Sequence, residues 1–167
     1  MNIILIGMPG AGKSTIGVIA AKMANLHFLD TDLLIQQREN EYLWKIIDKK
    51  GVDYFLQLEE TTILNTFFDH HIIATGGSAV FSEKAMAYLK SKGTVVFLDV
   101  PLKELQKRVN NFITRGVVSR NGRSLAEIYE ERYPLYQKYA DVTIKCSGKS
   151  MEQIASIVAQ IKNQDSN

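Results

Sequence analysis

The sequence predicts an α/β protein, a three-layer α/β/α arrangement around a five-stranded parallel sheet. Two observations carry this prediction: five short apolar runs, and the longer stretches of helical periodicity that separate them. The runs are continuously apolar rather than alternating, which is typical of parallel strands covered by helices on both faces. Strands that alternate with helices form βαβ units with right-handed crossovers, and therefore a parallel sheet.

The predicted strands are the apolar runs, and in chain order they are Ile3–Ile6, Leu26–Leu29, His71–Ala74, Thr94–Leu98 and Val142–Ile144. The predicted helices fill the stretches between and after them: Lys13–Ala24, Asp32–Glu39, Tyr42–Lys50, Asp53–Phe68, Glu83–Lys90, Leu102–Asn111, Leu125–Tyr139 and Met151–Lys162. Ser124 with Glu127, and Ser150 with Gln153, have the spacing of capping boxes at the last two helix starts. Pro101 fits the first turn of the helix after the fourth strand.

The size and composition bound the class of protein. The chain has 167 residues, about one domain, so residues 1–167 are expected to fold together. Hydrophobic residues make up 46% and charged residues 23%, which excludes a disordered or collagen-like chain. A net charge of +2 gives no argument for a nucleic-acid partner. No apolar run approaches a membrane span of about 18 residues, so we expect a cytoplasmic protein with no membrane partner.

Residues 112–123 interrupt the alternation of strands and helices. They contain two glycines and three arginines, Arg115, Arg120 and Arg123, without helical periodicity. A loop of about twelve residues without its own secondary structure is uncommon and often forms a functional lid. The alternative is a solvated surface loop, and we favour the lid because of the motif near the N-terminus.

That motif is a phosphate-binding sequence. Gly7–Ser14 matches G-x-x-x-x-G-K-[ST] and stands between the first strand and the first helix, the context that the motif requires. Glycines let backbone N–H groups surround phosphate oxygens, and the helix N-terminus adds partial positive charge. Lys13 is placed to neutralise the β- and γ-phosphates, and Ser14 to ligate Mg²⁺. The residues expected to bind ATP or GTP here are Gly10, Ala11, Gly12, Lys13, Ser14 and Thr15.

A magnesium nucleotide also needs a nearby carboxylate, and two strand ends supply candidates. Asp30 and Asp32 follow the second strand, and Asp99 ends the fourth. All would emerge at the carboxyl edge of a parallel sheet, where ligands bind. Capping the next helix is an adequate alternative role for Asp99. We favour Asp30 and Asp32, of which one can face Mg²⁺ and its water shell and the other an acceptor hydroxyl.

Together these motifs resemble the shikimate kinase family, within the nucleoside-monophosphate-kinase-like P-loop proteins. The phosphate-binding loop is followed by Asp30-Thr31-Asp32, similar to the family's D-[ST]-D segment. Ala74–Val80 resembles its glycine-rich segment, Arg115-Gly116-Val117-Val118 its lid sequence R-P-L-L, and Arg132–Tyr136 its R-x-P-L-Y stretch. In this order the motifs cover nearly the whole chain.

The resemblance implies ATP-dependent phosphorylation of the 3-hydroxyl of shikimate with Mg²⁺, by a monomeric enzyme. It implies that Asp32 contacts the shikimate hydroxyls as base or orienting group, and that Asp30 holds the magnesium water shell. The other implied shikimate-binding residues are Gly76, Gly77 and Arg132, the last binding the carboxylate. Arg115 would close with the lid over the transferred phosphoryl, while Arg108 and Lys149 would flank the adenine.

The chain departs from the family pattern at one position that bears on substrate. Phe55–Glu59 stands where the family has F-R-x-x-E, so Leu56 replaces an arginine that binds the shikimate carboxylate. One such hydrogen bond contributes about 1.5–3 kcal/mol, so its loss predicts about ten- to a hundredfold weaker use of shikimate. Ser78 for a third glycine and Gly116 for the lid proline are milder departures.

Three functions therefore stay open, and we favour the first. They are a shikimate kinase, a related kinase with another hydroxylated acceptor in a pocket that Leu56 makes more apolar, and a non-catalytic nucleotide-binding module. Trp44 is expected in the core, with a role in shaping the acceptor pocket as the alternative. Tyrosines at helical spacing predict one packed face: Tyr129, Tyr133, Tyr136 and Tyr139.

Overall fold

The computed structural model describes residues 1–108 and 122–161. Its centre is a five-stranded parallel sheet in the order β2-β3-β1-β4-β5. The strands are β1 (Asn2–Ile6), β2 (His27–Asp30), β3 (His71–Ala74), β4 (Gly93–Asp99) and β5 (Val142–Lys145). In the middle of the sheet, Ile4 of β1 is in register with Ile73 on one side and with Val95 on the other.

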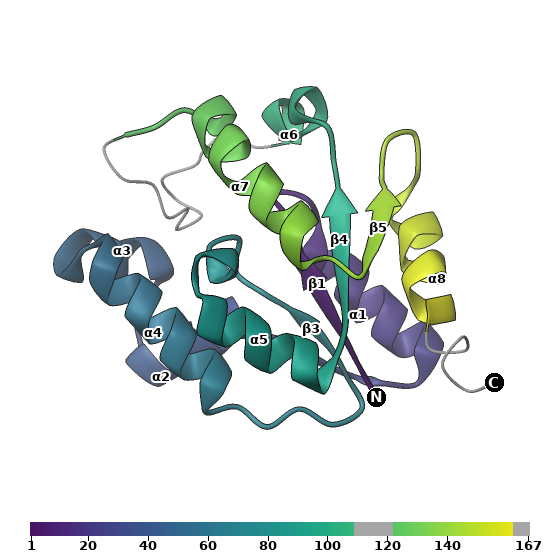
Figure 1. Cartoon of the computed structure of the whole chain (residues 1–167), viewed down its shortest axis with the longest axis horizontal. Coiled ribbons are helices and arrows are strands. Elements are labelled where there is room, and N and C mark those ends of the chain that lie inside the picture. The colour runs from purple at the N-terminus through teal and green to yellow at the C-terminus, as the bar shows by residue number, and fades with distance from the viewer. Residues whose placement is uncertain (109–121, 162–167) are drawn as a thin grey trace.

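Helices follow every strand. They are α1 (Lys13–Ala24), α2 (Thr31–Glu39), α3 (Leu43–Lys50), α4 (Val52–Leu64), α5 (Glu83–Lys92), α6 (Leu102–Arg108), α7 (Leu125–Tyr139) and α8 (Met151–Ile161), with a short 3₁₀ helix, η1 (Ala79–Phe81). Helices α1 and α8 cover one face of the sheet, and α5 and α7 the other (Figure 1). The three-layer α/β/α prediction is confirmed.

The core follows from this layering. Ile3–Ile6 of β1 are completely buried between the two helical layers, and burying each such side chain contributes about 1.5–3 kcal/mol. A second, smaller cluster lies among α2, α3 and α4, beside the β2 edge of the sheet; it consists of Ile35, Leu43, Ile46 and Phe55. The chain therefore has a main core between the sheet and the helices that cover it. The smaller cluster among α2, α3 and α4 is called the satellite core below.

In the described part of the chain, the five strands and eight α-helices were all predicted and η1 was not; most boundaries shift by one or two residues. The largest difference is α4, which ends at Leu64 rather than at Phe68. There the Thr66 hydroxyl donates to the Thr62 carbonyl (2.6 Å), a side-chain bond that competes with further helix. The ends of two predicted helices, residues 109–111 and 162, lie outside the described residues, as does most of the predicted lid.

The capping and packing predictions have mixed outcomes. Both capping boxes form, with reciprocal bonds at α7 and at α8. The tyrosine face of α7 packs on the core, and the Tyr136 ring stacks on Phe97 at 5.2 Å. The core prediction for Trp44 is wrong, because α3 buries Leu43 and Ile46 and leaves Trp44 39% exposed, outside the lining of the main cavity.

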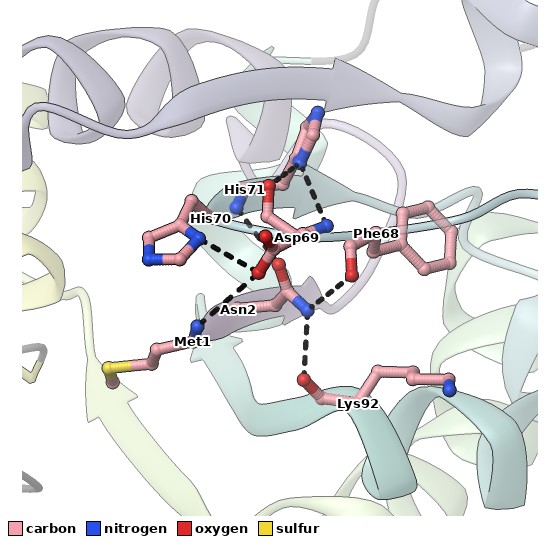
Figure 2. A network of polar contacts seen from close by, with 7 residues as sticks. All are labelled: Met1, Asn2, Phe68, Asp69, His70, His71 and Lys92. Atoms are coloured by element: carbon pink, nitrogen blue, oxygen red, sulfur yellow. Dashed lines mark hydrogen bonds and ion pairs between the residues drawn. The ribbon is translucent and has the colours of Figure 1, made fainter.

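At the amino ends of the strands, one side chain ties three segments together (Figure 2). Asn2 Nδ2 donates to the carbonyls of Phe68 (3.1 Å) and Lys92 (2.9 Å), and its Oδ1 accepts from the His71 N–H (2.9 Å). The nearby Asp69 carboxylate contacts the N-terminal amine at 3.9 Å. Asn2 thus fixes the entry of β3 and the end of α5 at the edge opposite the phosphate-binding loop.

Among the described residues, no helix is long and apolar enough to cross a membrane.

Candidate active site

A cavity of about 600 Å³ opens at the carboxyl edge of the sheet. Seven parts of the fold contribute to it: the loop between β1 and α1, the start of α2, helix α4, the segment after β3, and helices α6, α7 and α8. Its lining residues are Pro9, Gly10, Gly12, Lys13, Ser14, Thr15, Asp32, Phe55, Thr75, Gly76, Gly77, Ser78, Arg108, Arg132 and Met151. Segments far apart in the sequence therefore meet in one site.

The phosphate-binding loop is held in a conformation that needs glycine. Gly12, which precedes α1, has φ +95°, in the left-handed region. The buried Lys13 folds back over the loop, and its Nζ donates to the carbonyls of Gly7 (2.7 Å) and Met8 (3.0 Å). Burial lowers the pKa of Lys13 to about 8, against the opposing effect of the Asp32 and Asp30 carboxylates. The Lys13 ammonium group thus lies against the phosphate-binding loop.

Asp30 joins the loop to α2. Its Oδ1 caps the helix by accepting from the Asp32 N–H (2.9 Å) and the Leu33 N–H (3.2 Å). Its Oδ2 accepts from the Ser14 hydroxyl at 2.6 Å. Two hard oxygen donors thus stand side by side at the start of α1, the donor type that Mg²⁺ prefers. Among the described residues no three His, Cys, Asp or Glu side chains gather as metal ligands.

Asp32, in the first turn of α2, lines the cavity. Burial, together with the neighbouring Asp30 carboxylate, raises the pKa of Asp32 to about 6 against the opposing charge of Lys13. A carboxylate with its pKa close to neutrality is suited to accept a proton from a hydroxyl at the pH of a cell.

The segment after β3 approaches these groups too closely for side chains. A Cβ on Gly76 would lie 2.1 Å from Glu59 Oε1 and 2.6 Å from Asp32 Oδ1. One on Gly77 would lie 3.1 Å from an Arg132 guanidinium nitrogen. The segment is anchored on both sides, because Thr31 Oγ1 accepts from the Gly76 N–H (3.1 Å) and Gly77 O accepts from the Tyr136 hydroxyl (2.7 Å). Its backbone can therefore contact a ligand directly.

Two buried charged side chains complete the site. Arg132 of α7 is 1% exposed, lines the cavity, and places its guanidinium 5.2 Å from the centre of the Phe81 ring. Glu59 of α4 is 2% exposed, and its Oε2 accepts from the Ser78 hydroxyl at 2.7 Å. Burial, together with the nearby Asp32 carboxylate, raises the pKa of Glu59 to about 8.

Comparison with known proteins identifies the family. The sequence model of shikimate kinases matches residues 9–162. The chain belongs to the shikimate kinase family. A shikimate kinase from Clostridium botulinum (strain Eklund 17B / Type B) is 34% identical over 162 residues, 96% of each chain.

Solved structures agree. The shikimate kinase from Acinetobacter baumannii in complex with shikimate matches with a TM-score of 0.90 and 27% identity over 99% of this chain and 94% of that one. The shikimate kinase from Aquifex aeolicus matches with a TM-score of 0.83 and 32% identity over 99% of each chain. This member of the shikimate kinase family is therefore a small-molecule kinase with the P-loop kinase fold.

Most predicted site residues of this shikimate kinase family member meet in the cavity, and a few do not. Arg108 lines it, whereas the Lys149 side chain is exposed and donates to the Lys145 carbonyl (3.0 Å). Ala11 is buried, and its N–H donates within the loop to the Met8 carbonyl (3.1 Å). Arg115 lies outside the described residues.

Asp99, the alternative carboxylate, does not line the cavity. Instead of capping the next helix, its Oδ2 accepts from the Tyr133 hydroxyl (3.2 Å) and pairs with Lys145. This partnership joins β4 to α7 and β5, a role that needed the tertiary structure to be seen.

Leu56 is placed differently from the expectation. Phe55 lines the main cavity, but Leu56 packs with the satellite core and lines a separate hollow of about 140 Å³ with Ser78 and Phe81. Ser78 borders both spaces. Leu56 therefore does not line the main cavity, and Ser78 separates it from that cavity.

Sequence reasoning missed Glu59, Ser78 and Tyr136 as site residues. The sequence did indicate Glu59, since it stands four residues after Phe55 on the buried face of α4. Burying a carboxyl group there costs free energy unless the group has a polar partner. The Tyr136 hydroxyl had none, because an apolar face and a hydrogen bond to Gly77 give the same sequence pattern.

Proposed function

We propose that this protein transfers the γ-phosphoryl group of ATP to the 3-hydroxyl of shikimate, giving shikimate 3-phosphate and ADP. The observation that carries this proposal is that one cavity holds the phosphate-binding Lys13, the carboxylate of Asp32 and the guanidinium of Arg132. A nucleotide and a small anionic acceptor could bind there side by side. Family membership and the likeness to a relative solved with shikimate support the choice of acceptor.

The nucleotide occupies the end of the cavity under the start of α1. Lys13 leaves the carbonyls of Gly7 and Met8 and binds the β- and γ-phosphates instead. The backbone N–H groups of the loop, of Ser14 and of Thr15 surround the phosphate oxygens. Arg108, which lines the cavity from the end of α6, packs against the adenine. Lys149 is a weaker candidate for the other side of the base, since its side chain bonds elsewhere.

Mg²⁺ is the cofactor that this donor set fits. Ser14 Oγ would ligate it and Asp30 would hold its water shell, as their 2.6 Å contact allows. The ion supplies charge neutralisation between the β- and γ-phosphates. Asp30 Oδ2, which accepts from the Ser14 hydroxyl in this structure, would be the oxygen that accepts from a water of the ion's shell.

The acceptor occupies the end of the cavity between α2, α4 and α7. Asp32 accepts the proton of the attacking hydroxyl or orients it, the Gly77 N–H contacts the substrate, and Arg132 binds its carboxylate. A planar guanidinium suits a carboxylate because two of its N–H groups can donate at once. Arg115 would approach from the predicted lid to stabilise charge on the transferred phosphoryl group.

A second candidate is a kinase of the same kind with a less anionic hydroxylated acceptor. Leu56 favours it, because no cation occupies this position on α4. Arg132 favours shikimate, because its guanidinium lines the cavity and is suited to bind a carboxylate.

The test measures ADP release by purified protein with Mg-ATP and, in turn, shikimate, other hydroxy acids, sugars and nucleoside monophosphates. Release that depends on shikimate supports the first proposal. Release with another acceptor alone supports the second, and ATP binding without turnover on any acceptor points to a non-catalytic module. By family resemblance we also propose a cytoplasmic monomer, which light scattering after gel filtration checks for mass.

A further inference from the structure

The guanidinium of Arg132 has an aromatic partner that does not line the main cavity. Its central carbon lies over the Phe81 ring, 5.2 Å from the ring centre. Arg132 is 1% exposed, and the attraction between a cation and an aromatic face is strongest where water is excluded. Arg132 lines the main cavity, whereas Phe81 lines the separate hollow of about 140 Å³. The ring therefore contacts the guanidinium without occupying the space in which a ligand binds.

The Phe81 ring comes from a backbone segment that is anchored on both sides. Phe81 is the last residue of η1, which packs against both α4 and α7. Before η1, the Ser78 hydroxyl donates to Glu59 Oε2 of α4 (2.7 Å). After η1, the Ser82 hydroxyl donates to Glu60 Oε2 of α4 (2.6 Å). The Phe81 N–H donates to the Ser78 carbonyl (2.9 Å), which closes the turn. Helix α4 thus fixes the ring that lies under the guanidinium.

An aromatic ring holds a cation differently from a carboxylate. A carboxylate accepts hydrogen bonds from the edge of a guanidinium and neutralises its charge, so it competes with an anionic ligand. A ring face attracts the cation through its quadrupole and leaves the in-plane N–H groups to other acceptors. One guanidinium nitrogen of Arg132 lies 3.1 Å from the point where a Gly77 side chain would begin. The Phe81 ring can therefore hold the guanidinium beside this segment while the cation keeps its charge.

We propose that Phe81 is a positioning residue for Arg132: its ring holds the guanidinium by a cation–π contact in the orientation that receives the carboxylate of the acceptor. Phe81 acts on acceptor binding and on the preference for an anionic acceptor, and not on nucleotide binding or on the transfer step. The inference rests on the proposed function for the carboxylate of the acceptor, whereas the contact between ring and guanidinium is independent of it.

The first experiment detects the contact without substrate. Protons over the face of an aromatic ring resonate upfield, so the side-chain NMR resonances of Arg132, assigned with Arg132→Lys, should move downfield in Phe81→Leu. The matched control is Phe67→Leu, because Phe67 is 78% exposed between α4 and β3 and should leave these resonances unchanged. Arg132 resonances that are the same in wild type and Phe81→Leu overturn the proposal, whatever the acceptor proves to be.

The second experiment changes the electrons of the ring at nearly constant shape. Phe81 is replaced by phenylalanines with an increasing number of ring fluorines, which withdraw electron density and weaken the attraction for a cation. The KM for shikimate should rise with each step, to about five- to thirtyfold in the fully fluorinated protein and in Phe81→Leu, with kcat and the KM for ATP within about twofold of wild type. A side chain that only fills space would show no such series. Should Phe81→Leu fail to fold, the fluorinated proteins still carry the test.

Methyl shikimate is the matched acceptor, because the ester keeps the hydroxyls and removes the negative charge. Its KM should stay constant along the fluorine series. A shikimate KM that is constant along the series, or that rises equally for the ester, contradicts the positioning role. Unchanged Arg132 resonances together with turnover of shikimate refute this inference alone. Shifted resonances without turnover of shikimate refute the proposed acceptor and leave the contact with Phe81 in place.

Discussion

Asp32 reaches the cavity from the first turn of α2, where its pKa of about 6 keeps it mostly ionised at neutral pH. If it receives the hydroxyl proton, Asp32→Ala should lower kcat at least about a hundredfold, the usual contribution of a positioned base. Binding of Mg-ATP, measured by calorimetry, should stay close to wild type, because Lys13 and Ser14 are untouched. Lys13→Ala is the matched contrast, since it should abolish both turnover and tight nucleotide binding. Turnover near wild type in Asp32→Ala would refute the assigned role.

Leu56 tests how the acceptor carboxylate is bound. Leu56→Arg would add a cation beside Ser78, and a charge-assisted hydrogen bond should lower the KM for shikimate about ten- to a hundredfold. Leu56→Met keeps the apolar volume and serves as control, with its KM close to wild type. An unchanged shikimate KM in Leu56→Arg, measured in the coupled ADP assay, argues against a carboxylate subsite at this position.

At the scale of elements, Asn2 connects β1 to the start of β3 and the end of α5 through three hydrogen bonds (Figure 2). Asn2→Ala should destabilise the fold by about 2–4 kcal/mol, because buried backbone groups lose their partners. Urea unfolding checks this, and kcat of the folded fraction should not change, since the network lies opposite the cavity. The control is Asp69→Ala in the same network, where an exposed ion pair with the N-terminus contributes little. Equal stability of Asn2→Ala and wild type would contradict the assignment.

Elements were the best predicted level of the structure. Continuous apolar runs and capping residues carry strong local signals, so the strands and α-helices of the described residues were placed from the sequence, while the short η1 was not. The exposed Trp44 shows the limit: an apolar side chain on an amphipathic helix enters the core only if another element covers its side of α3. The close approach of Glu59 to Gly76 was beyond reach for the same reason, because it depends on how α4 packs against the segment after β3.

For the whole molecule, buried ionisable groups at the site link stability to pH. Folding raises the pKa of Glu59 from its ordinary 4.5 to about 8, so the folded state holds a proton that the unfolded chain releases between these values. Stability from this group is present below pH 4.5 and is lost as pH rises toward 8. The free energy of unfolding of Glu59→Gln, from denaturant titrations, should therefore gain on wild type between pH 5 and pH 8. A difference that is constant with pH would mean that Glu59 is ionised in both states.

The fold of the whole chain brings the phosphate-binding loop near the N-terminus and Arg132 of α7 to a single cavity, where we propose that the phosphoryl group is transferred to shikimate. The most direct measurement is ³¹P NMR of the protein incubated with Mg-ATP and shikimate. We predict a new phosphate ester resonance coupled to the proton on C3 of shikimate, with ADP formed in equal amount. ADP with only inorganic phosphate, or no shikimate ester while another acceptor is phosphorylated under the same conditions, would contradict transfer to shikimate.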